Sequence, residues 1–213
     1  MGFQFKQTLL ALVPHRDVRL LLRKYSGSLF KAGFAGAYLF PWVTPLAALS
    51  RPLSADELKN CARALREASL TAENGKINAV ETDIAAFSGQ ALLGPRLDLA
   101  ISSDVFGEKL LQRPHTEITE SQRVRRKAKD LKITPISPLI IGACLLPSAE
   151  FDKAALPPAP QLSFRAAAVA NMIWQPLEEE ACSPGASSSA SGSIGYKWKI
   201  GKLCWLGAVK KRT

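Results

Sequence analysis

An apolar run that leads into a capped amphipathic helix is the pattern that most constrains how this chain folds. The run extends from Phe40 to Ser50 and has the composition of a buried strand. After a short turn, Ser54 and Glu57 form a capping box, in which each side chain accepts a hydrogen bond from the other residue's backbone N–H. Apolar residues then recur at helical spacing at Leu58, Cys61, Ala62 and Leu65. The sequence therefore predicts a strand, a turn and a helix in this order.

The N-terminal residues predict a first strand and a first helix. Thr8 to Val13 is an apolar stretch that Pro14 ends, too early for the core of a secretory signal, so we expect a buried strand. A second apolar stripe follows at helical spacing and ends near Gly33. Its members are Val18, Leu21, Leu22, Tyr25 and Leu29.

The middle of the chain predicts further strands. Lys76 to Phe87 gives mixed signals and is compatible with a strand, whereas Arg96 to Ser102 alternates between apolar and polar residues as a half-buried strand does. Strands that follow helices without a regular strand–helix–strand repeat favour the α+β class.

The C-terminal part predicts a closing hairpin. Ser163 to Trp174 is typical of one long strand, and the final strand runs through Gly195 to Ile200. In the final strand Tyr196, Trp198 and Ile200 share the face that we expect to be buried, opposite Lys197 and Lys199. We interpret Gly201 as a β-bulge that returns Leu203 and Trp205 to the buried face.

This order of elements resembles the 2H phosphoesterase superfamily, in which two His-x-Thr motifs lie on two facing strands. The resemblance covers the chain from Thr8 to Trp205 and implies a two-lobed fold with antiparallel sheets and flanking helices. Ser137 to Cys144 occupies the place of the second motif strand. The positions that match the two motifs are Val43 and Pro45 for the first, and Leu139 and Ile141 for the second.

The resemblance implies an inactivated site. In the family the two histidines are general base and general acid on a phosphodiester, and the hydroxyls two residues on bind its oxygens from the same strand face. None of the four apolar residues at the matching positions transfers a proton. We expect the resulting apolar floor to be closed by packing; if it stays open, it suits an apolar or nucleobase-like group.

Two histidines occur in the chain. His115 stands in Pro114-His115-Thr116, which is similar to the opening of a second motif and leaves open a displaced catalytic role. His15 lies beside Pro14, and we interpret it as a surface turn residue.

The charge of the chain favours an anionic partner. The formal net charge is +10 over 213 residues, and a basic surface attracts phosphate. Two basic groups are candidate binding residues: Arg165, Lys197 and Lys199 with Trp174 in the closing hairpin, and Arg123 and Arg126 in a surface helix that a second capping box opens. The alternative is that both groups are solvated faces without a ligand.

Length, composition and cysteine spacing limit the possible domain organisation and cofactors of the chain. The length and 47% hydrophobic composition predict one domain over residues 1–213, with a flexible Ser- and Gly-rich loop at about 178–195. The four cysteines have no metal-ligand spacing, so we expect free thiols, no metal and no cofactor. No run reaches the length of a membrane span, and we expect a cytoplasmic protein.

These features together predict a non-catalytic protein that binds RNA or nucleotide ends through a basic surface. Two alternatives stay open: an active RNA 2′,3′-cyclic phosphodiesterase with displaced catalytic residues, and a scaffold that has kept only the fold and binds another protein.

Overall fold

The computed structural model describes residues 6–71, 76–87, 90–99, 131–146, 156–164, 167–176 and 196–206. The helices are α1 (Arg16–Lys31), α2 (Ala55–Thr71) and the short 3-10 helix η1 (Ala35–Tyr38). The strands are β1 (Gln7–Pro14), β2 (Thr44–Leu49), β3 (Ile77–Phe87), β4 (Gln90–Asp98), β5 (Ile133–Pro135), β6 (Cys144–Leu146), β7 (Ser163–Phe164), β8 (Ala167–Pro176), β9 (Tyr196–Ile200) and β10 (Cys204–Trp205). The class is α+β, as the sequence predicts.

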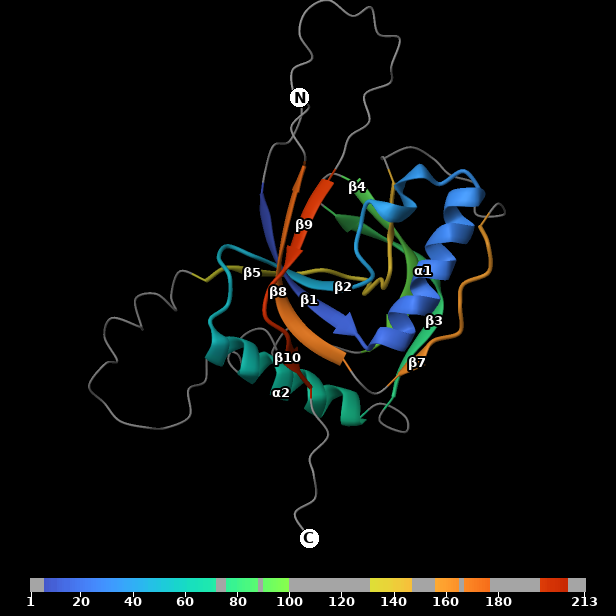
Figure 1. Cartoon of the computed structure of the whole chain (residues 1–213). Coiled ribbons are helices and arrows are strands. Elements are labelled where there is room, and N and C mark those ends of the chain that lie inside the picture. Colours follow the sequence, from blue (N-terminus) through green and yellow to red (C-terminus); the bar gives the residue numbers. More distant parts are fainter. Residues whose placement is uncertain are drawn as a thin grey trace, which may run out of the picture.

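Two antiparallel sheets organise the described residues (Figure 1). A six-stranded sheet has the order β10-β8-β1-β2-β5, with β9 also paired to β8, and a four-stranded sheet has the order β6-β4-β3-β7. Every strand pair is antiparallel. In Figure 1, α1 lies beside the four-stranded sheet and α2 runs beneath the six-stranded sheet.

The two faces of the six-stranded sheet are buried in different apolar clusters. The aromatic cluster contains the rings of Phe40, Phe87 and Trp174 and joins the sheet to the four-stranded sheet. The helix-side cluster includes Leu10, Leu12, Leu46 and, from α2, Leu58, Cys61 and Leu65. Alternate residues of β1 enter one cluster or the other, as the period of a strand requires.

Helix α1 buries most of the predicted stripe. Val18, Leu22, Tyr25 and Leu29 are buried, but Leu21 is 45% exposed, so its assignment to the buried face was wrong. Ser26 takes the remaining buried place because its hydroxyl donates to the carbonyl of Leu22 and accepts from Trp42 Nε1 at 2.9 Å. A polar residue is stable there because both hydrogen bonds are made inside the protein.

The capping box at the start of α2 is confirmed. The Ser54 N–H donates to Glu57 Oε2 at 2.7 Å, and the Glu57 N–H donates to Ser54 Oγ at 3.3 Å. The four apolar residues predicted to form its buried face are all buried in the helix-side cluster.

Two predicted strands have different bounds. The strand expected from Phe40 to Ser50 begins at Thr44, because residues 40–43 form a bend in which the Val43 N–H donates to the carbonyl of Pro41. The strand expected from Arg96 to Ser102 is the end of β4, which begins at Gln90 and ends at Asp98. Residues 100–102 lie outside the described part of the chain.

Two predicted strands are interrupted. Ser137 to Cys144 is irregular up to β6, because Pro138 lacks an N–H and Gly142 has a φ of +59°. Ser163 to Trp174 is divided into β7, in the four-stranded sheet, and β8, in the six-stranded sheet. The chain therefore crosses between the sheets where one strand was expected.

The closing edge contains the predicted bulge. Ile200 of β9 lies opposite Met172 of β8, and Cys204 of β10 lies opposite Val169 of β8. The chain therefore advances four positions along the edge while β8 advances three, which is the one extra residue of a bulge. Leu203 packs against the aromatic cluster beside Ile200. Trp198 and Trp205 do not become core residues, since they are 42% and 52% exposed at the edge of the sheet.

Candidate functional site

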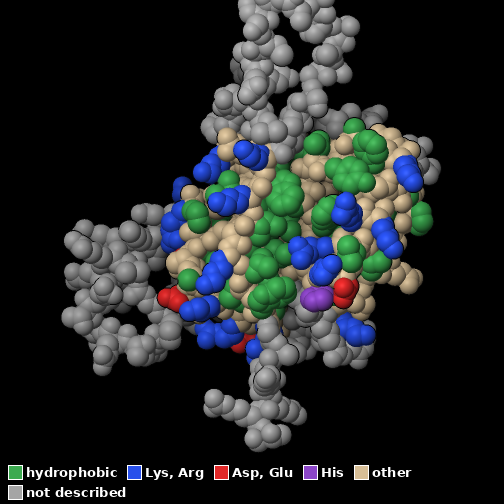
Figure 2. Space-filling view, in the orientation of Figure 1, with side chains coloured by type: hydrophobic (Ala, Val, Ile, Leu, Met, Phe, Trp, Pro, Cys, Tyr) green, Lys and Arg blue, Asp and Glu red, His purple; other side chains and the backbone are tan. Residues whose placement is uncertain are grey.

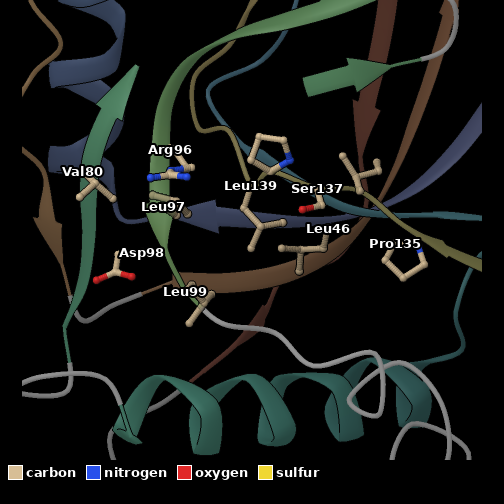
Figure 3. Close-up of a pocket in the computed structure, with 11 residues that line it drawn as sticks. Leu46, Val80, Arg96, Leu97, Asp98, Leu99, Pro135, Ser137 and Leu139 are labelled. Atoms are coloured by element: carbon tan, nitrogen blue, oxygen red, sulfur yellow. The ribbon is translucent and has the colours of Figure 1, made fainter. Parts of the chain in front are cut away.

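A cavity of about 440 Å³ lies between the two sheets (Figure 3). Leu46 of β2 forms one wall of the cavity, and residues 96–98 of β4 form another. Residues 135–139 complete the lining between these two walls. The cavity reaches solvent, since Val80 on its rim is one of the large exposed apolar residues. Its lining consists of Leu46, Val80, Arg96, Leu97, Asp98, Leu99, Pro135, Ile136, Ser137, Pro138 and Leu139.

The segment from residue 135 to residue 139 connects the two sheets across the cavity. At one end the Ile136 N–H donates to the carbonyl of Leu46 at 3.0 Å. At the other end the Leu97 N–H donates to the carbonyl of Leu139 at 2.8 Å. Two prolines in the segment restrict its backbone further. These bonds attach the segment to β2 at one end and to β4 at the other.

The two residues that match the first family motif, one just before β2 and one within it, do not line the cavity. Val43 is buried in the aromatic cluster, and Pro45 is buried opposite Ala11, which belongs to the same cluster. Leu46 lines the cavity instead. Buried Thr44 lies opposite Leu12, a member of the helix-side cluster, and therefore shares the face of Leu46.

A backbone hydrogen bond joins the two segments that match the family motifs. The Gly142 N–H donates to the carbonyl of Val43 at 3.3 Å, so the two predicted motif segments are brought together. Leu139 lines the cavity, while Ile141 is buried in the helix-side cluster. Because Val43 and Ile141 belong to different clusters, the four predicted residues do not enclose one common cavity.

The charges at the cavity do not form a phosphate site. Arg96 is the only basic residue among its described lining residues, and its side chain is paired with two carboxylates. Nη2 lies 2.9 Å from Glu81 Oε1, and Nη1 lies 3.7 Å from Asp83 Oδ2. Asp98 adds a further carboxylate to the lining. An anion entering the cavity would therefore meet more negative than positive charge.

The edge formed by β9 and β10 combines exposed tryptophans with lysines. Lys197 and Lys199 are exposed on one side of β9, with Lys202 in the connection to β10. Trp198 lies opposite Trp174 in the register, and Trp205 lies opposite Ala168. We name these five residues, the three lysines with Trp198 and Trp205, the β9–β10 edge. The prediction that Trp198 is core was wrong because an edge strand lacks a neighbour to cover it.

Trp174, a predicted binding residue, is a core residue. Its ring is 2% exposed and packs against Phe87 with ring centroids 5.1 Å apart. It therefore offers no surface on which a base can stack.

Helix α1 presents a second basic surface, which was not predicted from the sequence. Its exposed side holds Arg16, Arg19, Arg23, Lys24 and Lys31, which we name the α1 basic face. Among the described residues these side chains make no ion pair, and Asp17 is the single acidic residue of the helix. The signal was the helical spacing of these cations on the side opposite the buried stripe.

Figure 2 shows how the two basic surfaces are arranged. A band of hydrophobic side chains runs between one group of Lys and Arg side chains around β9 and a second group over α1. Exposed apolar residues on the described elements include Leu20 and Leu21 of α1, Tyr38 of η1 and the two tryptophans of the edge.

Several predicted site residues lie outside the described part of the chain. These are His115, Arg123, Arg126 and Arg165, together with the loop at 178–195. His15 is described and lies at the start of α1, where its Nδ1 is 3.3 Å from Asp17 Oδ2 and its side chain is half exposed.

The described thiols and acidic groups do not form a metal site. Within the described residues no group of His, Cys, Asp and Glu side chains is arranged to hold a metal ion. Burial raises the pKa of the Cys61 thiol to about 12, with a further contribution from Cys204, and raises that of Cys144 to about 12. Neither α1 nor α2, the two α-helices that the structure describes, has the length and hydrophobicity to cross a membrane.

No family model matches this chain, and no curated protein and no solved structure is significantly similar to it. The resemblance to 2H phosphoesterases therefore stays a prediction from the sequence pattern.

Proposed function

We propose that this chain is a non-catalytic protein that binds single-stranded RNA across the β9–β10 edge and the α1 basic face. The observation that carries the proposal is the exposure of Trp198 and Trp205 on an edge that also holds three exposed lysines. Single-strand binding sites combine cations that follow the backbone with aromatic rings on which bases stack. Trp198 and Trp205 supply the rings, and the three lysines supply the cations. Because Trp198 alternates with Lys197 and Lys199 along β9, the RNA is proposed to pass over the edge itself, where it can contact both faces of the strand.

The distribution of charge supports an anionic ligand. The cations of the α1 basic face have no ion-pair partner among the described residues, whereas Arg96 at the cavity is neutralised by two carboxylates. Free cations attract phosphates and release counterions when they bind them. The RNA backbone is therefore proposed to lie over the outer basic surfaces and not in the cavity.

The spacing of the two tryptophans sets the length of the ligand. Their partners in β8, Trp174 and Ala168, are six residues apart, which corresponds to about 20 Å along the strand. A stacked single strand rises about 3.4 Å per nucleotide, so about six nucleotides span the two rings. An RNA shorter than this reaches only one of them.

The proposal includes two further points: that the fold is similar to that of 2H phosphoesterases, and that the protein prefers the ends of RNA. The segments that match the two motifs meet at the Val43 carbonyl, and the residues at their positions are apolar. Such residues supply neither a general base nor a general acid. In this hypothesis the fold has kept an RNA-binding role after loss of the catalytic groups.

The test is a titration of the full chain with fluorescently labelled single-stranded RNA of increasing length, with and without a 2′,3′-cyclic phosphate end. We expect an affinity that rises with length up to about six nucleotides and falls steeply with salt. Trp198→Ala is expected to weaken binding between about fivefold and about a hundredfold, because one stacked base is lost. The double variant Lys197→Gln and Lys199→Gln is expected to reduce the salt slope by about 0.7 per phosphate contact.

Lys59→Gln is the matched control, since Lys59 is an exposed lysine that is already paired with Asp56 on α2. Absence of binding at low salt, or equal losses in the control and the Lys197/Lys199 variant, would contradict the proposal and favour the scaffold alternative. Hydrolysis of the cyclic phosphate that is lost in His115→Ala would instead favour the phosphodiesterase alternative.

A further inference from the structure

The cavity between the sheets is not used by the proposed RNA surface. Apolar side chains normally pack until such spaces close, yet a cavity remains beside residues 135–139, which backbone hydrogen bonds attach to β2 at one end and to β4 at the other. Beside this segment, the Ile141 N–H donates to the carbonyl of Pro95 at 2.9 Å and attaches the chain to β4. The volume of about 440 Å³ lies within the range of small-molecule sites.

The lining of the cavity defines what it can accept. Most of its residues are apolar, and the labelled Leu46, Leu97, Leu99 and Leu139 surround the open centre in Figure 3. A ligand must therefore bury an apolar body against leucines and prolines. A flat ring fits such a site at low entropic cost because it has few rotatable bonds.

Arg96 offers a flat face and not a free charge. Nη2 donates a hydrogen bond to Glu81 Oε1 at 2.9 Å, which lies in the plane of the guanidinium, and Nη1 forms an ion pair with Asp83 at 3.7 Å. An aromatic ring can stack on the face of a guanidinium that is held in this way. The two carboxylates beside Arg96 also repel a phosphate that approaches it.

Asp98 supplies a charged hydrogen-bond acceptor at the site, in addition to the hydroxyl-bearing Ser137 in the lining. Its carboxylate lines the cavity, is exposed, and makes no ion pair among the described residues. A carboxylate accepts hydrogen bonds, so it selects a ligand with an N–H donor and disfavours an anion.

From these contacts we infer that the cavity is a binding site for a planar aromatic molecule that carries an amino group and no phosphate, of the aminopurine type. The ring lies against the apolar walls and the face of Arg96, and its amino group donates to Asp98. This site does not depend on the RNA proposal, because none of its lining residues belongs to the β9–β10 edge or to the α1 basic face.

The experiment titrates the full chain with 2-aminopurine base and follows the change in its fluorescence. We expect saturable binding with a Kd in the range of about 0.1 to 1 mM, as suits a ligand of this size. The 5′-monophosphate of 2-aminopurine riboside is expected to bind at least about tenfold more weakly, because its charge meets three carboxylates.

Variants locate the binding. Val80→Trp fills the rim of the cavity from an exposed position, so the fold is expected to survive, and binding should fall by at least about tenfold. Asp98→Ala should weaken binding by about fivefold through loss of the hydrogen bond. Lys59→Gln on α2 is the control that should bind as the natural chain does.

Absence of saturable binding would overturn the inference, as would equal binding by Val80→Trp and the natural chain. Tighter binding of the monophosphate than of the base would also overturn it, since it would show a phosphate site. Circular dichroism of each variant establishes that a loss of binding is not a loss of fold.

Discussion

At the scale of single residues, Glu57 connects Arg51 and Ser54 at the start of α2. Arg51 donates to both of its carboxylate oxygens, with Nη2 to Oε1 at 2.8 Å and Nη1 to Oε2 at 3.0 Å, and the Ser54 N–H donates to Oε2. The Arg51 hydrogen bond is the largest cause that lowers the pKa of Glu57 from 4.5 to about 2. The sequence predicted the capping box but not the arginine that strengthens it.

The first prediction is that Glu57 stabilises the fold only when it is ionised. Its folded-state pKa lies below its unfolded value of 4.5, so its contribution is complete above pH 4.5 and is lost as the pH falls toward about 2. Glu57→Gln is expected to lower the free energy of unfolding by about 1 to 2 kcal/mol at pH 7, because solvent screens the partly exposed pair with Arg51, and by less than half of that near pH 3.

Urea denaturation of both proteins across this pH range measures the difference. Asp56→Asn is the control, because the Asp56–Lys59 pair is exposed and should contribute little at any pH. A difference for Glu57→Gln that stays constant between pH 7 and pH 3 would contradict stabilisation by the ionised carboxylate.

The second prediction concerns Gly36 in η1. A Cβ at this position would overlap the carbonyl oxygen of Leu145 in β6, so Gly36→Ala forces the two backbones apart. We expect a loss of about 2 to 4 kcal/mol in the free energy of unfolding.

Gly27→Ala is the matched change inside α1. Its Cβ would meet only the end of the Tyr38 side chain, at 3.2 Å, so the substitution should cost little or add about 0.5 kcal/mol of stability. Thermal unfolding of the two variants compares them, and equal effects would show that the contact with Leu145 is not close in solution.

At the scale of elements, β8 and β9 each place a tryptophan at the same point of their register, but one side chain is buried and the other is exposed. Trp174 and Trp198 lie opposite each other, but β8 is covered by neighbouring strands and by the aromatic cluster, whereas β9 forms an edge. Side-chain alternation places both rings on one face, and only the position of the strand in the sheet decides which ring is buried.

The third prediction follows from this difference. Trp174→Ala is expected to lower the free energy of unfolding by about 3 to 5 kcal/mol, because it leaves a cavity between Phe40 and Phe87. Trp198→Ala should cost about 1 kcal/mol or less, since its ring is already 42% exposed. Chemical denaturation monitored by circular dichroism makes the comparison, and similar losses for the two variants would mean that Trp198 is packed in solution.

At the scale of the whole molecule, the positive charge is separated from the cavity. The α1 basic face and the β9–β10 edge carry cations without ion-pair partners among the described residues, while the cavity between the sheets holds an arginine paired with two carboxylates. A long anionic ligand and a small apolar ligand therefore have different places on one fold.

The fourth prediction tests the cooperativity of the whole fold through its thiols. In a variant with Cys182→Ser and Cys204→Ser, burial keeps the pKa of the Cys144 thiol at about 12, and it keeps the pKa of the Cys61 thiol above its ordinary value although the smaller contribution of Cys204 is lost. At pH 8 this reduces the thiolate fraction of Cys144 by about a thousandfold relative to a thiol with a pKa of 9, and burial also shields both thiols, so native protein should react negligibly with a thiol reagent. Both thiols should react in urea, and rapid labelling without urea would reveal local opening of the core.

Features that depend on neighbouring residues could be predicted from the sequence alone. The helix start at Ser54 and Glu57, the buried stripe of α1, the strand β1 and the bulge after Ile200 are all readable because capping, helical period and strand alternation act over a few residues. The α+β class follows from the order of these local elements. The positive charge is also a property of composition alone.

Which faces are covered, and where space remains, depends instead on contacts made in three dimensions. The burial of Trp174 and the exposure of Trp198 follow from which strand has a neighbour, and the place of Leu46 at the cavity in contrast to Pro45 depends on the register of β2 with β1. The pairing of Arg96 with Glu81 and Asp83 joins residues of two strands across a sheet. These contacts connect residues that are distant in sequence, so no local period specifies them.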